Sequence, residues 1–349
     1  MGPLFLNFLD SYLSPRQGQV VVQGAFSDLF TIADSVFQGT VMGPMLWNSF
    51  FSDVAVPAKS AGGSEKIFAD DLSVFQEFDR STPVPECKAK LSQCESQVHK
   101  WGRQNRVSFD AAKEHTVILH PLEWHGEAFK VLGCMIDPDM RMRSAVEQVL
   151  SKIRPKITAI LRTRGYYSTP NLIFQFKTHI WGLIETNMGA YFHACSSLLE
   201  KIDAAQNRFL RELDMTPEHA FLEYAFAPPS LRRNIGALGF LHKRVLGKSH
   251  ACISSLLPFW TDQPECIRAR GHTKKLYDHS QEIHFQSVMY ANSFFALIVI
   301  HNNLPQHLVD VITVKVFQKY LTHIARTRCQ SGDPRWANSF CGRTGPDID

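Results

Sequence analysis

The sequence predicts an α+β fold that becomes wholly helical toward its C-terminal end. Two observations carry this prediction. Before residue 138, short β-branched and aromatic runs alternate with helical patterns, and glycine and proline separate them. From Val146 onward, apolar residues recur every three or four positions, which is the spacing of helices that bury one face. We therefore expect a mixed region over 1–138, helices over 139–335 and a flexible tail over 336–349.

The composition is that of an ordinary globular protein. The chain has 349 residues, of which 44% are hydrophobic and 20% charged, and this excludes collagen-like, low-complexity and wholly disordered classes. The longest apolar run, Phe294–Ile300, is far shorter than the roughly 20 residues of a membrane helix. The cysteines lack paired spacing, and the first residues lack the features of a secretory signal. We therefore expect an intracellular protein with free thiols.

The first part of the chain predicts alternating helices and short strands. Gly24 permits a hairpin turn between two β-branched or aromatic runs, and Pro44 suits the first turn of a helix. The expected elements are a helix over 4–13, strands over 19–23 and 29–32, a glycine-punctuated loop over 38–44 and a buried helix over 45–54.

Two adjacent carboxylates, Asp70 and Asp71, lie between short apolar runs, the pattern of a hairpin with acids at its turn. Carboxylates on a tight turn can offer oxygen ligands to Mg²⁺. In isolation such a pair also fits a solvated turn, because Asp is a favoured turn residue. The order of the neighbouring motifs along the chain favours a metal site over a solvated turn. A Gln-Gly loop begins 32 residues before Asp70, and an Asp-x-x-Lys motif and a Leu-Gly hairpin follow.

Beyond the acidic hairpin the sequence predicts one long helix, two short strands and a series of helices. Proline residues separate the later helices. The long helix covers 85–106, the strands cover 117–120 and 129–136, and the later helices lie near 142–164, 170–187, 191–212, 229–247 and 306–325.

Basic residues are concentrated between positions 141 and 164. The net charge of the whole chain, +4, is too small to indicate an anionic partner. This stretch carries seven basic residues against Glu147 alone, a local charge of +6. Such a block suits contact with phosphates, and a solvated helix face is the alternative. The seven are Arg141, Arg143, Lys152, Arg154, Lys156, Arg162 and Arg164.

In this order, the motifs resemble those of the reverse transcriptases of LINE-like non-long-terminal-repeat retrotransposons, including the jockey-type elements. The loop Phe37–Pro44 resembles the family's substrate-pocket loop, and Phe68–Asp71 matches its catalytic motif. Val107–Lys113 resembles the motif whose lysine lies near the incoming triphosphate, and Phe129–Asp137 resembles the primer-gripping hairpin. In the helical half, residues 197–210 look like the thumb helix, and 231–233 and 302–305 look like C-terminal signatures of the family.

The resemblance implies a fold in three parts. Residues 1–138 would form a partial reverse transcriptase palm, an antiparallel sheet with helices. Residues 139–215 would form an all-helical thumb, and 216–335 a helical C-terminal extension.

The resemblance also implies an RNA-directed DNA polymerase, in which a primer 3′ hydroxyl attacks the α-phosphorus of a deoxynucleoside triphosphate. Asp70 and Asp71 would be catalytic and would bind Mg²⁺ or Mn²⁺. The partners would be an RNA template, a DNA primer or duplex and deoxynucleoside triphosphates, in the nucleus and away from membranes. The other implied residues are Gln38, Gly39, Phe68, Ala69 and Lys113 in the substrate pocket, and Leu132 and Gly133 in the primer grip.

The sequence also departs from the family pattern. Such polymerases use a third metal-binding Asp on an earlier strand, and that strand has no counterpart here. Asp10 mimics it superficially, but the residues that follow resemble a later segment of the family, so we interpret Asp10 as a decoy. Phe37 replaces the usual proline, and Asp110 stands where the family often has Asn. We expect an N-terminally truncated polymerase that lacks the fingers.

These departures leave two alternatives open. The chain is either a polymerase with a weakened metal site or a catalytically dead, retroelement-derived nucleic-acid-binding remnant that uses its basic helix. A relic that does not fold stably is a further alternative, because loss of a central strand leaves a bare sheet edge.

A zinc finger is disfavoured. Cys87, Cys94 and His99 have spacings that fit no common finger, and no fourth ligand is evident.

Overall fold

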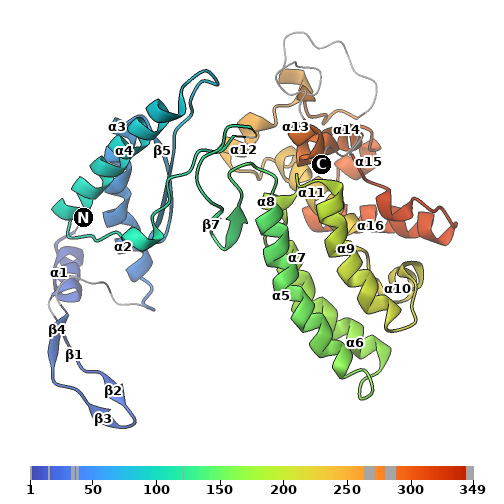
Figure 1. Ribbon diagram of the computed structural model, residues 1–349, viewed down its shortest axis with the longest axis horizontal. Coiled ribbons are helices and arrows are strands. Elements are labelled where there is room, and N and C mark those ends of the chain that lie inside the picture. Colours follow the sequence, from blue (N-terminus) through green and yellow to red (C-terminus); the bar gives the residue numbers. More distant parts are fainter. Residues whose placement is uncertain are drawn as a thin grey trace. The chain divides into compact units, whose positions relative to one another are not determined.

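The computed structural model describes residues 2–14, 16–32, 36, 39–120, 122–262, 272–279 and 288–342 (Figure 1). It divides into two compact units, Met1–Thr116 and Val117–Asp349. Small antiparallel strand pairs and many helices make up the described residues, which confirms the predicted α+β class. Among them, no helix has the length and apolar character needed to cross a membrane.

The first unit begins with a helix and a hairpin arm. Gln23 and Gly24, with φ of 50° and 84°, form the left-handed turn that the hairpin requires, as expected from Gly24. The strands are shorter than predicted, and their apolar side chains are largely exposed, for example Val22 and Phe26 at 63% and 68%. The elements are α1 (Pro3–Leu13), β1 (Arg16–Gly18), β2 (Val21–Val22), β3 (Ala25–Phe26) and β4 (Phe30–Ile32), with β1 paired to β4 and β2 to β3.

A small core holds the rest of the first unit together. Phe51, Val54 and Ala58 pack against Val98 and Trp101 from the long helix of this unit. The predicted helices over 45–54 and 85–106 and the hairpin around Asp70 and Asp71 are confirmed. The elements are α2 (Gly43–Phe51), η1 (Ser52–Val54), α3 (Ala55–Ser60), β5 (Ser64–Phe68), β6 (Asp71–Phe75), α4 (Val84–Gln104) and η2 (Ala111–Lys113).

The second unit opens on a loop and a hairpin. The strand predicted over 117–120 is wrong, because Ile118 makes only a single antiparallel bridge to His125 and no partner strand among the described residues extends it. The predicted hairpin over 129–136 is confirmed as β7 (Phe129–Val131) paired with β8 (Cys134–Ile136).

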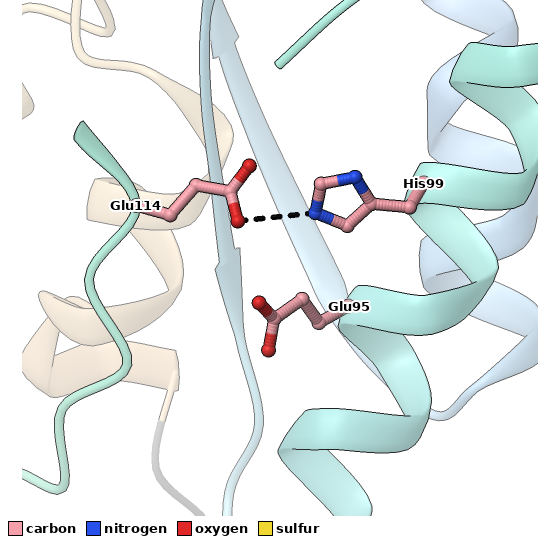
Figure 2. Close-up of side chains that lie close together, drawn as sticks. All are labelled: Glu95, His99 and Glu114. Carbon is pink, nitrogen blue, oxygen red and sulfur yellow. Dashed lines mark hydrogen bonds and ion pairs between the residues drawn. The ribbon is translucent and has the colours of Figure 1, made fainter. Parts of the chain in front are cut away.

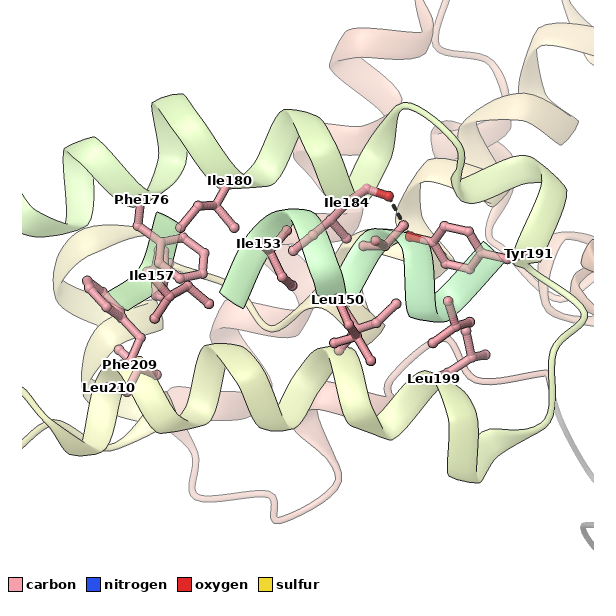
Figure 3. Packing of buried hydrophobic residues seen from close by; sticks show 14 of the residues in the cluster. Leu150, Ile153, Ile157, Phe176, Ile180, Ile184, Tyr191, Leu199, Phe209 and Leu210 are labelled. Carbon is pink, nitrogen blue, oxygen red and sulfur yellow. Dashed lines mark hydrogen bonds between the residues drawn. The ribbon is translucent and has the colours of Figure 1, made fainter. Parts of the chain in front are cut away.

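Three helical layers then bury the first core of this unit (Figure 3). Ile153 and Ile157 from the helix over 143–162 face Ile180 and Phe176 from the next segment and Phe209 from the helix over 196–211. Each of these side chains is at most 3% exposed. The predicted helix over 170–187 is interrupted by a π-helical turn. The elements are α5 (Arg143–Arg162), α6 (Thr169–Phe176), η3 (Lys177–Trp181), α7 (Gly182–Glu185), α8 (Met188–Tyr191) and α9 (Ser196–Arg211).

The C-terminal helices enclose a second core around Leu238, Leu241, Phe317 and Leu321, all fully buried. The helix predicted over 306–325 is two helices, because Thr313 caps a new helix by accepting a hydrogen bond from the Val316 N–H. The elements are α10 (Pro217–Tyr224), α11 (Pro229–Val245), α12 (Ala251–Leu256), η4 (Trp260–Asp262), α13 (Val288–Asn292), η7 (Phe294–Ala296), α14 (Leu297–Asn302), α15 (Gln306–Val309), α16 (Val314–Gln330) and η8 (Trp336–Asn338). Within the segment expected as a flexible tail, Trp336 and Phe340 are buried in this core.

Candidate functional site

The acidic pair lies on the tight turn between β5 and β6. Ala69 and Asp70 form the two-residue turn, and Asp71 begins β6 opposite Phe68. Ala69 takes a left-handed φ of 54°, which matches the twist of a two-residue hairpin. Asp70 and Asp71 are both exposed, and Phe68 beside them is 65% exposed. The turn therefore presents two carboxylates and an aromatic ring to solvent.

Helix α2 supports this turn through Trp47. The indole Nε1–H donates a hydrogen bond of 2.9 Å to the Ala69 carbonyl. The same indole stacks on Phe51, with ring centroids 5.1 Å apart, and Phe51 is 1% exposed in the small core. The buried Phe51 ring thus holds the Trp47 indole in place, and the indole N–H holds the turn at Ala69. The sequence patterns did not identify Trp47 as a site residue. The one feature of the sequence that pointed to it was an indole N–H on the predicted helix directly after the glycine-punctuated loop.

The loop before α2 is described only in part. Phe37 and Gln38 lie outside the described residues, so the expected role of Gln38 has no structural counterpart here. Gly39 takes a left-handed φ of 78°. Thr40 Oγ1 lies 2.6 Å from the Tyr12 hydroxyl and accepts a hydrogen bond of 3.2 Å from the Gly43 N–H. These contacts tie the start of α2 to helix α1.

Lys113 lies on the short turn η2. The Asp110 carboxylate accepts a hydrogen bond from the Ala112 N–H and lies 3.4 Å from the Lys113 ammonium. The Lys113 side chain is 83% exposed. Within the described part of the chain, no hydrogen bond or ion pair joins Lys113 to Asp70 or Asp71, and its carboxylate partner is Asp110. Because the Lys113 side chain is largely exposed, an anion from solvent can still reach its ammonium.

The acidic turn fits a hydrated cation. Mg²⁺ is commonly bound by one or two carboxylates, with waters and substrate phosphates as its remaining ligands. In the described ranges, no group of three close His, Cys, Asp or Glu ligands includes Asp70 or Asp71. Asp10 lies exposed on helix α1 rather than on a strand. The two carboxylates therefore suit a metal ion that completes its shell with water and phosphate.

In the second unit, the β7–β8 turn is built by Leu132 and Gly133. Both are left-handed, with φ of 46° and 87°. The Asn187 side-chain amide donates a hydrogen bond of 3.3 Å to the Gly133 carbonyl, and Cys134 anchors β8 in the first helical core. Leu132 is 59% exposed at the tip. The turn is thus a firmly held apolar protrusion.

The seven basic residues lie on α5 and next to its two ends. All seven are exposed, while the opposite face of α5 is buried. Arg141 pairs with Asp139 at 3.7 Å, and Arg164 pairs with Glu212. The other five, Arg143, Lys152, Arg154, Lys156 and Arg162, have no carboxylate within 4.0 Å in the described ranges.

Asp137 holds the start of this helix. Both of its carboxylate oxygens accept from the Ser144 N–H, the shorter contact being 3.0 Å, and the residue is 7% exposed. An acid at a helix start offsets the positive end of the helix dipole. The buried Asp137 therefore helps to position α5 and its cations. In the sequence analysis Asp137 was only the last residue of the hairpin motif, with no role of its own.

Comparison with known proteins finds distant relatives among mobile-element polymerases. The chain is 25% identical over 239 residues to the "Probable RNA-directed DNA polymerase from transposon X-element" of Drosophila melanogaster, covering 59% of this chain and 24% of that protein. It is 24% identical over 238 residues to the "RNA-directed DNA polymerase from mobile element jockey" of Drosophila funebris, covering 62% and 26%. The jockey polymerase of Drosophila melanogaster is 23% identical over 228 residues, covering 59% and 25%.

These matches confirm the predicted resemblance to the jockey-type reverse transcriptases of non-long-terminal-repeat retrotransposons. The chain spans about a quarter of the length of the curated relatives it matches. No family model matches it. No solved structure matches it either.

Proposed function

We propose that this chain carries part of the RNA-directed DNA polymerase of a jockey-type retrotransposon, with Asp70 and Asp71 at its catalytic centre. One observation carries the proposal: an exposed Asp-Asp pair stands on a hairpin turn held by Trp47, in a chain similar to enzymes of that name. The proposed reaction is attack of a primer 3′ hydroxyl on the α-phosphorus of a deoxynucleoside triphosphate. The new phosphodiester bond forms as the bond to pyrophosphate breaks.

Each candidate residue has a role that matches its chemistry. The carboxylates of Asp70 and Asp71 would hold Mg²⁺ or Mn²⁺. Bound there, these ions would neutralise charge that develops on the phosphoryl oxygens. The exposed ammonium of Lys113 would offset the charge of the departing phosphates.

The pocket and primer residues would act by shape. Gln38, Gly39, Phe68 and Ala69 would border the incoming nucleotide, and Leu132 with Gly133 would support the primer end. Leu132 suits this role because an exposed apolar tip on a fixed turn can pack against a sugar without binding a base edge.

Helix α5 would bind the template–primer duplex through its phosphate backbone. Its five cations without an acidic partner in the described ranges can each replace a condensed counterion, an interaction that needs no particular base sequence. The duplex would consist of an RNA template and a DNA primer. We propose that the chain acts on chromosomal DNA in the nucleus, where such elements insert.

Primer extension tests the catalytic proposal. The full chain is incubated with an RNA template, a DNA primer and deoxynucleoside triphosphates in Mg²⁺ or Mn²⁺. We expect incorporation that falls at least about 100-fold in Asp70→Asn and in Asp71→Asn, because each change removes a charged metal ligand. Asp79→Asn is the matched control, since Asp79 is an exposed acid in the loop after β6.

The same assay separates the rival function. A catalytically dead nucleic-acid-binding remnant is favoured by the lack of a third close ligand at Asp70 and Asp71 among the described residues. That function predicts salt-sensitive binding of duplex with no incorporation in any variant. Incorporation that survives both Asn substitutions would overturn the assignment of the acidic pair.

A further inference from the structure

Glu95, His99 and Glu114 form a second cluster of possible metal ligands in the first unit (Figure 2). One ligand atom from each residue lies within 4.8 Å of the other two. We propose that these three side chains bind a zinc-class divalent ion. The proposal concerns different residues from the acidic turn and does not rest on the polymerase function.

The chain builds this cluster by folding back on its own helix. Glu95 and His99 are four residues apart on α4, so they share one face. After α4 the chain turns at Arg106, whose φ is 56°, and the Val107 N–H donates to the Gly102 carbonyl at 2.8 Å. The returning segment then brings Glu114 opposite His99.

Gly102 makes this return possible. A Cβ at that position would lie 2.7 Å from the Val107 carbonyl oxygen and 2.8 Å from the Phe109 ring, closer than real Cβ atoms approach. Phe109 in turn meets the His99 ring edge to face, with centroids 5.5 Å apart. The imidazole is therefore oriented by packing before any ligand arrives.

The distances suit coordination. The Nε2 atom of His99 lies 3.0 Å from a carboxylate oxygen of Glu114. Two ligands bound at about 2.0–2.2 Å to one tetrahedral ion lie about 3.3 Å apart. In Figure 2 the Glu95 carboxylate extends from α4 toward the same space as the other two side chains. Binding would draw the exposed Glu95 side chain closer, because its ligand atom lies within 4.8 Å of the other two.

The charges in the cluster call for a cation. Two carboxylates face one imidazole, and among the described residues neither Glu95 nor Glu114 pairs with a Lys or Arg. The Oε1 atom of Glu114, the oxygen that does not contact His99, is buried and has no hydrogen-bond partner within the described ranges. A buried acceptor without a donor is costly. A divalent ion would neutralise the two acids, and it would give Oε1 a partner where Glu114 binds through both of its oxygens.

The mixture of ligands selects the kind of ion. Mg²⁺ and Ca²⁺ prefer oxygen ligands only, whereas zinc accepts imidazole nitrogen together with carboxylate oxygen. Three protein ligands leave a fourth position for water, and the exposed Glu95 side chain is in contact with solvent. Cysteines take no part: the Cys94 thiol points to the Ala58 carbonyl and the Cys87 thiol to the Thr82 carbonyl. The structure thus joins His99 to two glutamates rather than to the cysteines near it in sequence.

Zinc titration of the full chain tests the site. Protein stripped with a chelator is titrated with Zn²⁺ by calorimetry and, in parallel, with Co²⁺ by visible absorption. Glu95→Gln is the main variant because its exposed side chain can change without loss of fold, and His99→Gln is the second. His115→Gln, an exposed histidine next to Glu114, is the matched control.

We expect the wild type and His115→Gln to bind one more equivalent than Glu95→Gln and His99→Gln, or to bind it at least about 100-fold more tightly. The Co²⁺ spectrum of that equivalent should lack thiolate charge-transfer bands. The proposal fails if the wild type and the Glu95→Gln and His99→Gln variants bind Zn²⁺ alike. It also fails if the equivalent missing from the variants carries thiolate bands, because the ligands would then include cysteine.

Discussion

The two units of this chain are packed very differently. In the first unit a small core of six buried residues holds α2, α3 and α4, and the hairpin arm before it exposes Val22, Phe26 and Phe30. In the second unit two extensive cores, around Ile153 and around Leu238, bury one face of the long helices. The candidate catalytic acids lie in the sparsely packed unit, whereas the candidate duplex-binding cations lie on the densely packed one. Stability and proposed chemistry can therefore be perturbed separately.

The largest effect is expected in the helical core of the second unit. Phe209 is fully buried between Phe176 and Phe226, so Phe209→Ala leaves a cavity and should lower the free energy of unfolding by about 3–5 kcal/mol. Phe30→Ala on the exposed arm should change it by less than about 0.5 kcal/mol. Urea unfolding measures both. Equal effects of the two substitutions would contradict the difference in packing.

Acidification should also weaken the second unit selectively. Burial lowers the pKa of His301 to about 3, and it lowers the pKa values of His242 and His272 as well. Below the ordinary histidine pKa of about 6.5, these histidines bind protons in the unfolded chain but stay largely neutral in the folded chain. The free energy of unfolding should therefore fall by about 1.4 kcal/mol per pH unit for His301 as pH drops from 6.5 toward 3.

His301→Leu sharpens this prediction. Neither ring nitrogen of His301 has a hydrogen-bond partner in the described ranges, so an apolar residue of similar size should fit without loss of stability at pH 7. Urea unfolding at several pH values should show a shallower acid slope in the variant. An unchanged slope would show that His301 does not stay neutral in the folded state.

A moderate effect is expected on nucleic-acid binding by α5. Lys152→Gln with Lys156→Gln removes two exposed cations that have no acidic partner among the described residues. We expect the slope of log affinity against log salt to become shallower by about 1 for each phosphate that the variant no longer neutralises. Lys315→Gln with Lys319→Gln on α16 is the control, because it removes equal charge elsewhere in the same unit. Fluorescence anisotropy with a labelled duplex measures the slopes, and equal slopes in both double variants would count against α5.

The effect on stability at Trp47 should be smaller than the effect in the helical core of the second unit. Trp47→Phe keeps the aromatic contact with Phe51 but deletes the hydrogen bond to the Ala69 carbonyl, at a cost of about 1 kcal/mol. Because that bond holds the turn bearing Asp70, we expect a larger proportional loss of primer extension than of stability. Comparing incorporation rates with urea midpoints separates the two, and a fall in stability without a fall in incorporation would remove Trp47 from the site.

Local sequence patterns predicted the features that depend on neighbouring residues. The hairpin at Asp70 and Asp71, the hairpin at Leu132 and Gly133 and the long basic helix all follow from turn chemistry or apolar periodicity, and all are present. The features that were missed depend on tertiary contacts. Trp47 reaches Ala69 across 22 residues, and Glu114 reaches His99 only because the chain reverses at Arg106. The strand expected at Ile118 failed because a β-branched run needs a partner strand.

Metal binding at the acidic turn tests the central claim most directly. Mn²⁺ is titrated into the full chain with template–primer and an unreactive deoxynucleoside triphosphate analogue, and bound ion is measured by electron paramagnetic resonance. We predict a bound population that depends on the nucleotide, disappears in Asp70→Asn and Asp71→Asn, and persists in Asp79→Asn and Glu95→Gln. Retention of that nucleotide-dependent population in both Asn variants would contradict the assignment of Asp70 and Asp71 as the metal-binding pair.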